Sequence, residues 1–122
     1  MNIVTIYHSF DQLTVFNTWL KSNCKFTEDY YSFRLSNEEY LTIANYSKMS
    51  EELNEIEKYQ LAMSFGNYTG WCVHWNSDHL IIKFLENLNK QVSVMVDNDK
   101  AQLIWISEAL LMNRDDLIFW LK

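Results

Sequence analysis

The feature of this sequence that most constrains its fold is an order of elements that occurs twice. Residues 2–46 and 68–106 each have the pattern of a strand, a serine-capped helix and a pair of strands. Four positions recur at a constant offset, with Ser9, Leu13, Phe16 and Leu20 matching Ser77, Ile81, Phe84 and Leu88. This recurrence predicts a β-α-β-β plan used twice, with an approximate twofold repeat.

The first half begins with a run of β-branched residues. Asn2–Tyr7 (NIVTIY) is nearly continuous in apolar character, which is typical of an interior strand covered on both faces. Ser9 and Gln12 then match a capping box at the start of a helix. Phe10 opens the series of apolar residues at helical spacing that continues to Leu20.

A hairpin is expected after this helix. Tyr31, Phe33 and Leu35 alternate with polar residues, 37–39 is polar, and Tyr40–Tyr46 (YLTIANY) has the composition of a returning strand. A helix beginning at Ser36 is the alternative, but Tyr, Thr and Ile favour a strand.

The segment between the two halves predicts a short helix and a second hairpin. Ser50 followed by two glutamates is a good helix start, so we expect a helix over 50–58. The pattern then alternates over Leu61–Phe65. Gly66-Asn67 has the composition of a two-residue hairpin turn, after which Tyr68–Trp75 forms the returning strand.

The second half repeats the plan and adds helical turns at its end. Asn76–Asp78 cap a helix whose inner residues are Leu80, Ile81, Phe84, Leu85 and Leu88. The expected later elements are a strand over Val92–Val96, a turn at Asp97–Lys100, a strand over Ala101–Ile106, and helical turns at Ser107–Met112 and Asp115–Leu121.

These elements predict a single α+β domain over residues 1–122. We expect one mixed, largely antiparallel sheet with helices packed mainly on one face. The apolar fraction of 48% and the aromatic fraction of 16% are sufficient for a packed core. The start of the chain lacks the pattern of a signal peptide, and Cys24 and Cys72 have no disulfide-framework spacing, so a soluble cytoplasmic protein is expected.

The negative charge is concentrated in one part of the sequence. The chain has a net charge of −6, and residues 28–57 hold eight acidic and two basic residues, which account for all of it. Nucleic acid and anionic membranes would be repelled by such a surface, whereas a basic protein is its natural complement.

Tyrosines lie among these acids, and this combination is typical of a protein-binding surface. A tyrosine ring supplies contact area, while carboxylates steer a basic partner toward the surface. The residues predicted to bind the partner are Glu38, Glu39, Tyr40, Tyr46, Glu51, Glu52, Glu55 and Tyr59.

One cluster suggests chemistry instead of binding. Cys72 and His74 share a face of the predicted strand, and His79 begins the following helix. A Cys-x-His-x4-His cluster could hold zinc, which needs three or four nitrogen or sulfur ligands. Cys72 or Cys24 with His74 could also act as a nucleophile and base, but neither an adjacent base nor an activated thiolate is evident from sequence. We therefore expect Cys72 to be a packed thiol, and neither a metal nor a cofactor is predicted.

The chain resembles the small cytoplasmic immunity proteins of bacterial toxin systems. The resemblance consists of the small size, the aromatic-rich α+β plan and the acidic block that contains Glu38, Glu39, Glu51, Glu52 and Glu55. It implies a non-catalytic inhibitor that binds a cognate toxin, often a basic nuclease, and whose carboxylates occupy the place of substrate phosphates. Two alternatives remain: a phage or mobile-element inhibitor of a host defence protein, and a small enzyme or metal-binding domain centred on Cys72, His74 and His79.

Overall fold

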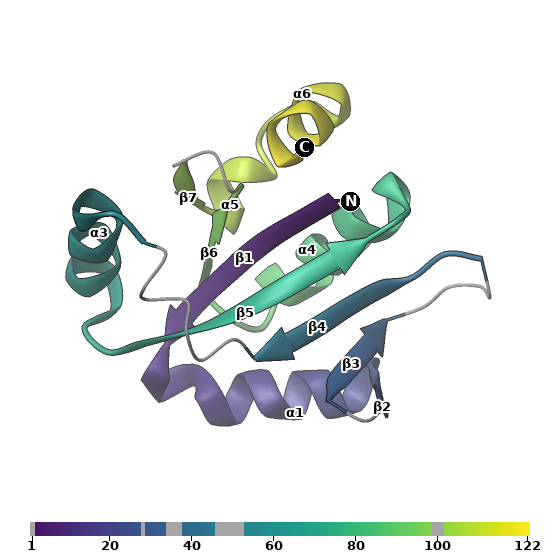
Figure 1. The fold of residues 1–122 in the computed structure, drawn as a ribbon, viewed down its shortest axis with the longest axis horizontal. Coiled ribbons are helices and arrows are strands. Elements are labelled where there is room, and N and C mark those ends of the chain that lie inside the picture. Colours follow the sequence, from purple (N-terminus) through teal and green to yellow (C-terminus); the bar gives the residue numbers. More distant parts are fainter. Residues whose placement is uncertain (1, 28, 34–37, 46–52, 99–101) are drawn as a thin grey trace.

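The computed structural model describes residues 2–27, 29–33, 38–45, 53–98 and 102–122. Across these ranges, seven strands form one sheet in the order β2-β3-β4-β5-β1-β6-β7 (Figure 1). All pairings between neighbouring described strands are antiparallel. The prediction of an α+β fold with a largely antiparallel sheet is confirmed.

Helices and strands are interspersed along the chain. The strands are β1 (Asn2–Ser9), β2 (Lys25–Thr27), β3 (Tyr30–Phe33), β4 (Leu41–Asn45), β5 (Tyr68–Trp75), β6 (Val94–Asp97) and β7 (Leu103–Trp105). The helices are the 3-10 turn η1 (Phe10–Gln12), α1 (Leu13–Asn23), α3 (Glu55–Phe65), α4 (Asp78–Asn89), α5 (Ile106–Ala109) and α6 (Arg114–Leu121). None of the helices in the described ranges is long and apolar enough to cross a membrane.

The two longest strands, β1 and β5, form the centre of the sheet. They pair along their whole lengths, with Asn2 opposite Trp75 and Ser9 opposite Tyr68. The interior strand expected over Asn2–Tyr7 and the strand expected over Tyr68–Trp75 are therefore confirmed.

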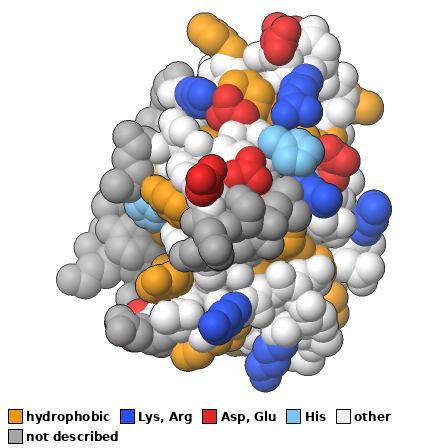
Figure 2. All heavy atoms as spheres, turned by 90° about the vertical axis from the view of Figure 1, so that its right-hand side faces the viewer, with side chains coloured by type: hydrophobic (Ala, Val, Ile, Leu, Met, Phe, Trp, Pro, Cys, Tyr) orange, Lys and Arg blue, Asp and Glu red, His pale blue; other side chains and the backbone are white. Residues whose placement is uncertain are grey.

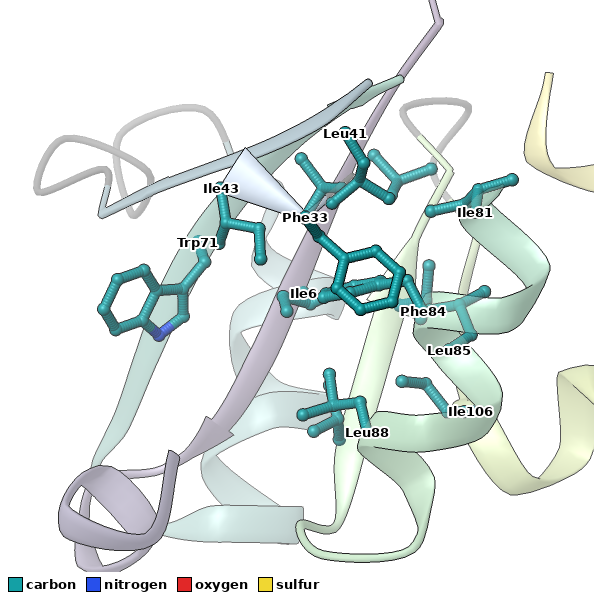
Figure 3. Close-up of a cluster of buried hydrophobic side chains, with 14 of the residues drawn as sticks. Ile6, Phe33, Leu41, Ile43, Trp71, Ile81, Phe84, Leu85, Leu88 and Ile106 are labelled. Carbon is teal, nitrogen blue, oxygen red and sulfur yellow. The ribbon is translucent and has the colours of Figure 1, made fainter. Parts of the chain in front are cut away.

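The two faces of the sheet are covered unequally. The first face carries the larger core and packs against α1, α4, α5 and α6, as expected for helices mainly on one face. Figure 3 shows part of this core, in which Phe33 of β3 lies next to Phe84 of α4. The second face carries a smaller cluster in which Tyr7 and Met95 pack with Leu61 of α3.

The cap predicted at Ser77 forms at the start of α4, whereas Ser9 caps the 3-10 turn η1 and α1 starts after Gln12 without a side-chain cap. The Oγ of Ser9 accepts a hydrogen bond from the Asp11 N–H at 3.2 Å, and the Oγ of Ser77 accepts one from the Leu80 N–H at 3.3 Å. Phe10 is 56% exposed because it lies in the 3-10 turn η1, before the apolar face of α1 begins.

The predicted hairpins β3–β4 and β6–β7 are confirmed, and β4 excludes the alternative helix at this place. Strand β2 was not predicted. It has only three residues, all exposed, and pairs with β3 at the edge of the sheet. A strand this short contains too few residues to show a periodic pattern.

The prediction for residues 50–67 is wrong in two respects. Helix α3 starts at Glu55 with Asn54 as its cap, and the predicted start at Ser50 lies outside the described residues. The helix continues through Leu61–Phe65, where a strand was expected. Gly66 ends the helix instead of forming a hairpin turn, and its N–H donates to the Ala62 carbonyl at 2.8 Å. The helix is favoured here because the capping box of Asn54 and Glu57 starts it and Leu61 is buried on the sheet.

Replacing Gly66 with alanine is expected to lower the free energy of unfolding by about 1 kcal/mol. Gly66 has φ 71° and ψ −107°, a conformation that residues with a Cβ rarely adopt. A Cβ at this position would meet no atom within 4 Å, so the loss would come from the backbone alone. Chemical denaturation of Gly66→Ala measures it, with the exposed helical change Ser64→Ala as control. An unchanged stability would show that residue 66 is not held at positive φ.

The repeated order of elements does not produce a symmetric sheet. Both halves contain a strand, a serine cap, a helix and a hairpin, although the serine of the first half caps the 3-10 turn η1 before α1. The first half joins the central pair through β4, the second strand of its hairpin, whereas the second half joins through β6, the first strand of its hairpin. The repeat therefore concerns the order of elements along the chain, and not their arrangement in the sheet.

Candidate protein-binding surface

Among the described helices and strands, α3 carries the largest group of exposed large apolar side chains. Ile56, Tyr59 and Met63 are exposed by 77%, 68% and 70% respectively. Their spacing of three and four residues places them on one side of the helix. We call these three residues the outer face of α3.

The opposite side of α3 is held against the sheet. Leu61 is fully buried and Glu57 is 7% exposed. The side-chain amide of Gln60 donates to the Leu103 carbonyl of β7 at 2.9 Å. Since this inner side already fixes the helix, the described fold makes no use of the outer face.

Two of the predicted partner-binding residues accompany the outer face. Tyr59 belongs to it, and the side chain of Glu55 is 93% exposed with an ion pair to Lys58 at 3.6 Å. Three further predicted residues, Tyr46, Glu51 and Glu52, lie outside the described residues.

The other three predicted residues lie where β5 ends. The Asn76 amide donates to the Glu38 carbonyl at 2.7 Å and accepts from the Tyr40 N–H at 2.8 Å. Glu39 accepts from the Ser77 hydroxyl at 2.9 Å. Tyr40 is 37% exposed.

The charges at this end of the sheet are mixed. Asp78, next to Ser77, forms an ion pair with Lys122 at 3.0 Å. Figure 2 shows this side of the molecule, where acidic side chains are interspersed with basic ones. A basic partner would therefore not meet a surface of uniform negative charge here.

The structure does not bring the described part of the predicted surface together. The segment before β4 and helix α3 lie at opposite ends of the sheet (Figure 1). Strand β5, with its eight residues, separates these ends by about 26 Å. The sequence places Tyr40 and Glu55 near each other, but β4 runs along the sheet between them and carries the chain away.

Glu57, one of the eight acidic residues in 28–57, stabilises the fold and is not part of the exposed surface. Glu57 accepts from the Asn54 N–H at 3.3 Å, and its own N–H donates to the Asn54 side chain at 2.8 Å. Burial raises the pKa of Tyr7 on the adjacent strand, and the nearby Asp97 and Glu57 raise it further. The Asn54-x-x-Glu57 spacing is a capping-box signal in the sequence that could have identified this role.

The predicted Cys72, His74 and His79 cluster is only partly assembled. Cys72 and His74 are on the second face of the sheet, with Sγ and Nε2 3.4 Å apart. His79 is exposed at the start of α4, which packs on the first face. Within the described ranges, His, Cys, Asp and Glu form no group of three that could hold a metal ion.

The remaining histidine, His8, is fully buried in the first-face core. Its Nε2 accepts from the Trp71 indole N–H at 2.8 Å, and its Nδ1 lies 2.8 Å from the Ser9 carbonyl. An indole nitrogen only donates, so the ring proton of the neutral His8 is on Nδ1, which donates to Ser9. The three histidines therefore have separate environments.

A pocket of about 480 Å³ lies between α1 and the end of α4. Its lining is mainly hydroxyl and amide side chains, together with Trp19, and Lys90 is its single titratable group among the described residues. This pocket therefore contains neither a nucleophile with a base nor a pair of carboxylates.

No protein-family model, no curated protein and no solved structure matches this chain. Its function is therefore argued from the fold and the surfaces described above.

Proposed function

We propose that this protein binds a basic partner protein and inhibits it without catalysing a reaction. The partner that fits best is a nuclease-like bacterial toxin, which makes the chain an immunity protein acting in the cytoplasm. The outer face of α3 is the centre of the proposed contact.

The observation that carries this proposal is the exposure of Ile56, Tyr59 and Met63 on a helix whose other side is already buried. A surface helix normally has one apolar side and one polar side. A cluster of exposed apolar side chains on the outward side of such a helix is typical of a surface that another protein covers. Tyrosine at the middle position is among the residue types that contribute most to binding energy.

The charge of the chain supports a basic partner. Its net charge is −6, and Glu55 lies next to the outer face of α3 with its side chain almost fully exposed. Opposite charge accelerates the encounter of two proteins, and a nuclease that binds phosphates is basic on its functional surface. The same charge disfavours nucleic acid and anionic membranes as partners.

Tyr59→Ala is expected to weaken partner binding at least about tenfold, the effect of losing an aromatic anchor. Tagged protein would be used to capture partners from its native cells at low salt, with elution by a salt step and identification by mass spectrometry. The affinity of the recovered protein for the wild type and for Tyr59→Ala is then measured. The matched control is Phe119→Ala, which removes an aromatic side chain that is 82% exposed on α6.

A single basic protein in the salt eluate, with loss of binding in Tyr59→Ala only, supports the proposal. Rescue of cells from that protein's toxicity tests immunity directly, while a host defence protein in the eluate identifies the chain as an inhibitor of host defence. Equal binding by Tyr59→Ala and the wild type would exclude the outer face of α3 as the contact.

A further inference from the structure

Cys72 and His74 form a thiol–imidazole pair that the proposed binding function does not use. They are two residues apart on β5, so both side chains are on the second face of the sheet. The distance of 3.4 Å between Sγ and Nε2 allows a proton to pass from the thiol to the ring. A thiol becomes a nucleophile as its thiolate, and an adjacent base is one way to form the thiolate at neutral pH.

The residues around this pair leave it half-buried. Thr5 of β1 and Ala44 of β4 are opposite Cys72 in the sheet register, and both have small side chains. Like Cys72 and His74, they are of intermediate exposure. Cys72 also packs against the edge of the second-face cluster beneath α3. A small reagent therefore has a direct approach that a fully buried thiol would not offer.

Other titratable groups lie on the same side of the sheet as the pair. Tyr7 and Tyr68 are on the same face, Asp97 is opposite Thr5 across β1 and β6, and Glu57 approaches from α3. Burial, together with Asp97 and Glu57, raises the pKa of Tyr7, so this phenol stays neutral. Because the thiol proton would pass to the neighbouring ring, its transfer leaves the net charge of the pair unchanged.

Cys24 has a different environment. It is half-buried where α1 ends, and burial raises the pKa of its thiol to about 12. A thiol with such a pKa is almost wholly protonated at neutral pH and reacts slowly. The chain thus contains an internal reference for the reactivity of Cys72.

We propose that Cys72 is a modification site, a nucleophilic thiol with His74 as its general base, that exchanges with low-molecular-weight disulfides. The Nε2 of His74 accepts the proton of Sγ, and the thiolate attacks one sulfur of the disulfide. A new sulfur–sulfur bond forms while the original one breaks, and the departing thiolate takes the proton from His74. The products are one mixed disulfide on Cys72 and one small thiol, so no further oxidant is needed.

Folded protein incubated with excess oxidised glutathione at pH 7.5 tests this reaction. Mass spectrometry of the intact chain and of its peptides is expected to show one adduct, on Cys72, with Cys24 unmodified. His74→Gln is expected to slow the reaction at least about tenfold, since general-base catalysis typically contributes about 100-fold to 10,000-fold. His79→Gln, which removes an exposed histidine on the other side of the sheet, should react at the wild-type rate.

The pH profile distinguishes a base from a residue that only supports the fold. The rates for His74→Gln and wild type should converge above about pH 9, where a thiol ionises without help. If the wild-type rate follows hydroxide concentration throughout, or if Cys72 reacts as slowly as Cys24, the proposal is wrong. The wild-type profile decides this even if His74→Gln loosens the fold.

Discussion

Phe84→Ala should reduce the free energy of unfolding by about 3–5 kcal/mol, the largest single effect that we expect. Phe84 is fully buried, and its ring lies 5.4 Å from that of Trp19 and 5.9 Å from that of Phe33. It therefore joins α4 to α1 and to the β3 side of the sheet. Figure 3 shows its ring next to that of Phe33. Truncation to alanine removes the buried area of the ring. It also leaves a cavity, whose lining residues lose their contacts with the ring. Guanidinium denaturation of Phe84→Ala and the wild type measures the loss. The comparison requires that the unfolding free energy depends equally steeply on denaturant concentration in both proteins.

Phe119→Ala is the matched control for this substitution. The same side chain is removed, but Phe119 is 82% exposed, so its loss should change stability by no more than about 0.5 kcal/mol. A loss below about 1 kcal/mol for Phe84→Ala would mean that the three rings do not form the centre of the core.

The second large effect is a dependence of stability on pH that arises from His8. Its ring is fully buried beside Phe16 and Trp71, with ring centres 4.7 Å and 6.3 Å away. Burial lowers the pKa of His8 from its ordinary value of 6.5, although its contact with the Ser9 carbonyl partly opposes the shift. Protonation would place a charge in the core and remove the acceptor of the Trp71 N–H.

The direction of the pH dependence follows from which state binds the proton. Below pH 6.5 the unfolded chain takes up a proton at His8, while the folded chain does not until the pH reaches its lower pKa. Stability from this group is therefore fully present above about pH 7 and falls between 6.5 and the folded-state pKa. The maximum slope for one group is about 1.4 kcal/mol per pH unit.

Denaturation between pH 8 and 5.5 for wild type, His8→Gln and His79→Gln measures this contribution. Glutamine keeps an acceptor for the Trp71 indole but does not titrate, so His8→Gln should flatten the profile over this range. His79→Gln removes an exposed histidine and should keep the wild-type slope. The same slope in all three proteins would mean that His8 is not the group responsible.

Several features depend on near neighbours in the sequence, and these were predictable. The alternation over Tyr68–Trp75 predicted which side chains share a face, and therefore that Cys72 and His74 point the same way. Ser77 was recognisable as a helix cap because its partner, the Leu80 N–H, is only three residues away. Both signals involve only residues of one strand or one helical turn.

Helix α3 shows where such local signals are ambiguous. Leu61 and Phe65 fit an alternating strand, but they are also four residues apart and share one side of a helix. The packing of Leu61 against Tyr7 and Met95 decides between the two, because that cluster lies on the second face of the sheet. Only the helical conformation leaves Ile56, Tyr59 and Met63 together on the outside.

By itself, the sequence determined the α+β class, the presence of strands over Asn2–Tyr7 and Tyr68–Trp75, the Ser77 cap and the negative charge of the chain. Only the tertiary structure decided that Glu38 and Glu55 lie at opposite ends of the sheet, that Glu57 is buried, and that His79 is separated from the Cys72 and His74 pair. The physical reason is that caps and alternation act over a few residues. Which face a helix covers, and where a strand carries the chain, depends on apolar contacts between segments far apart in the sequence.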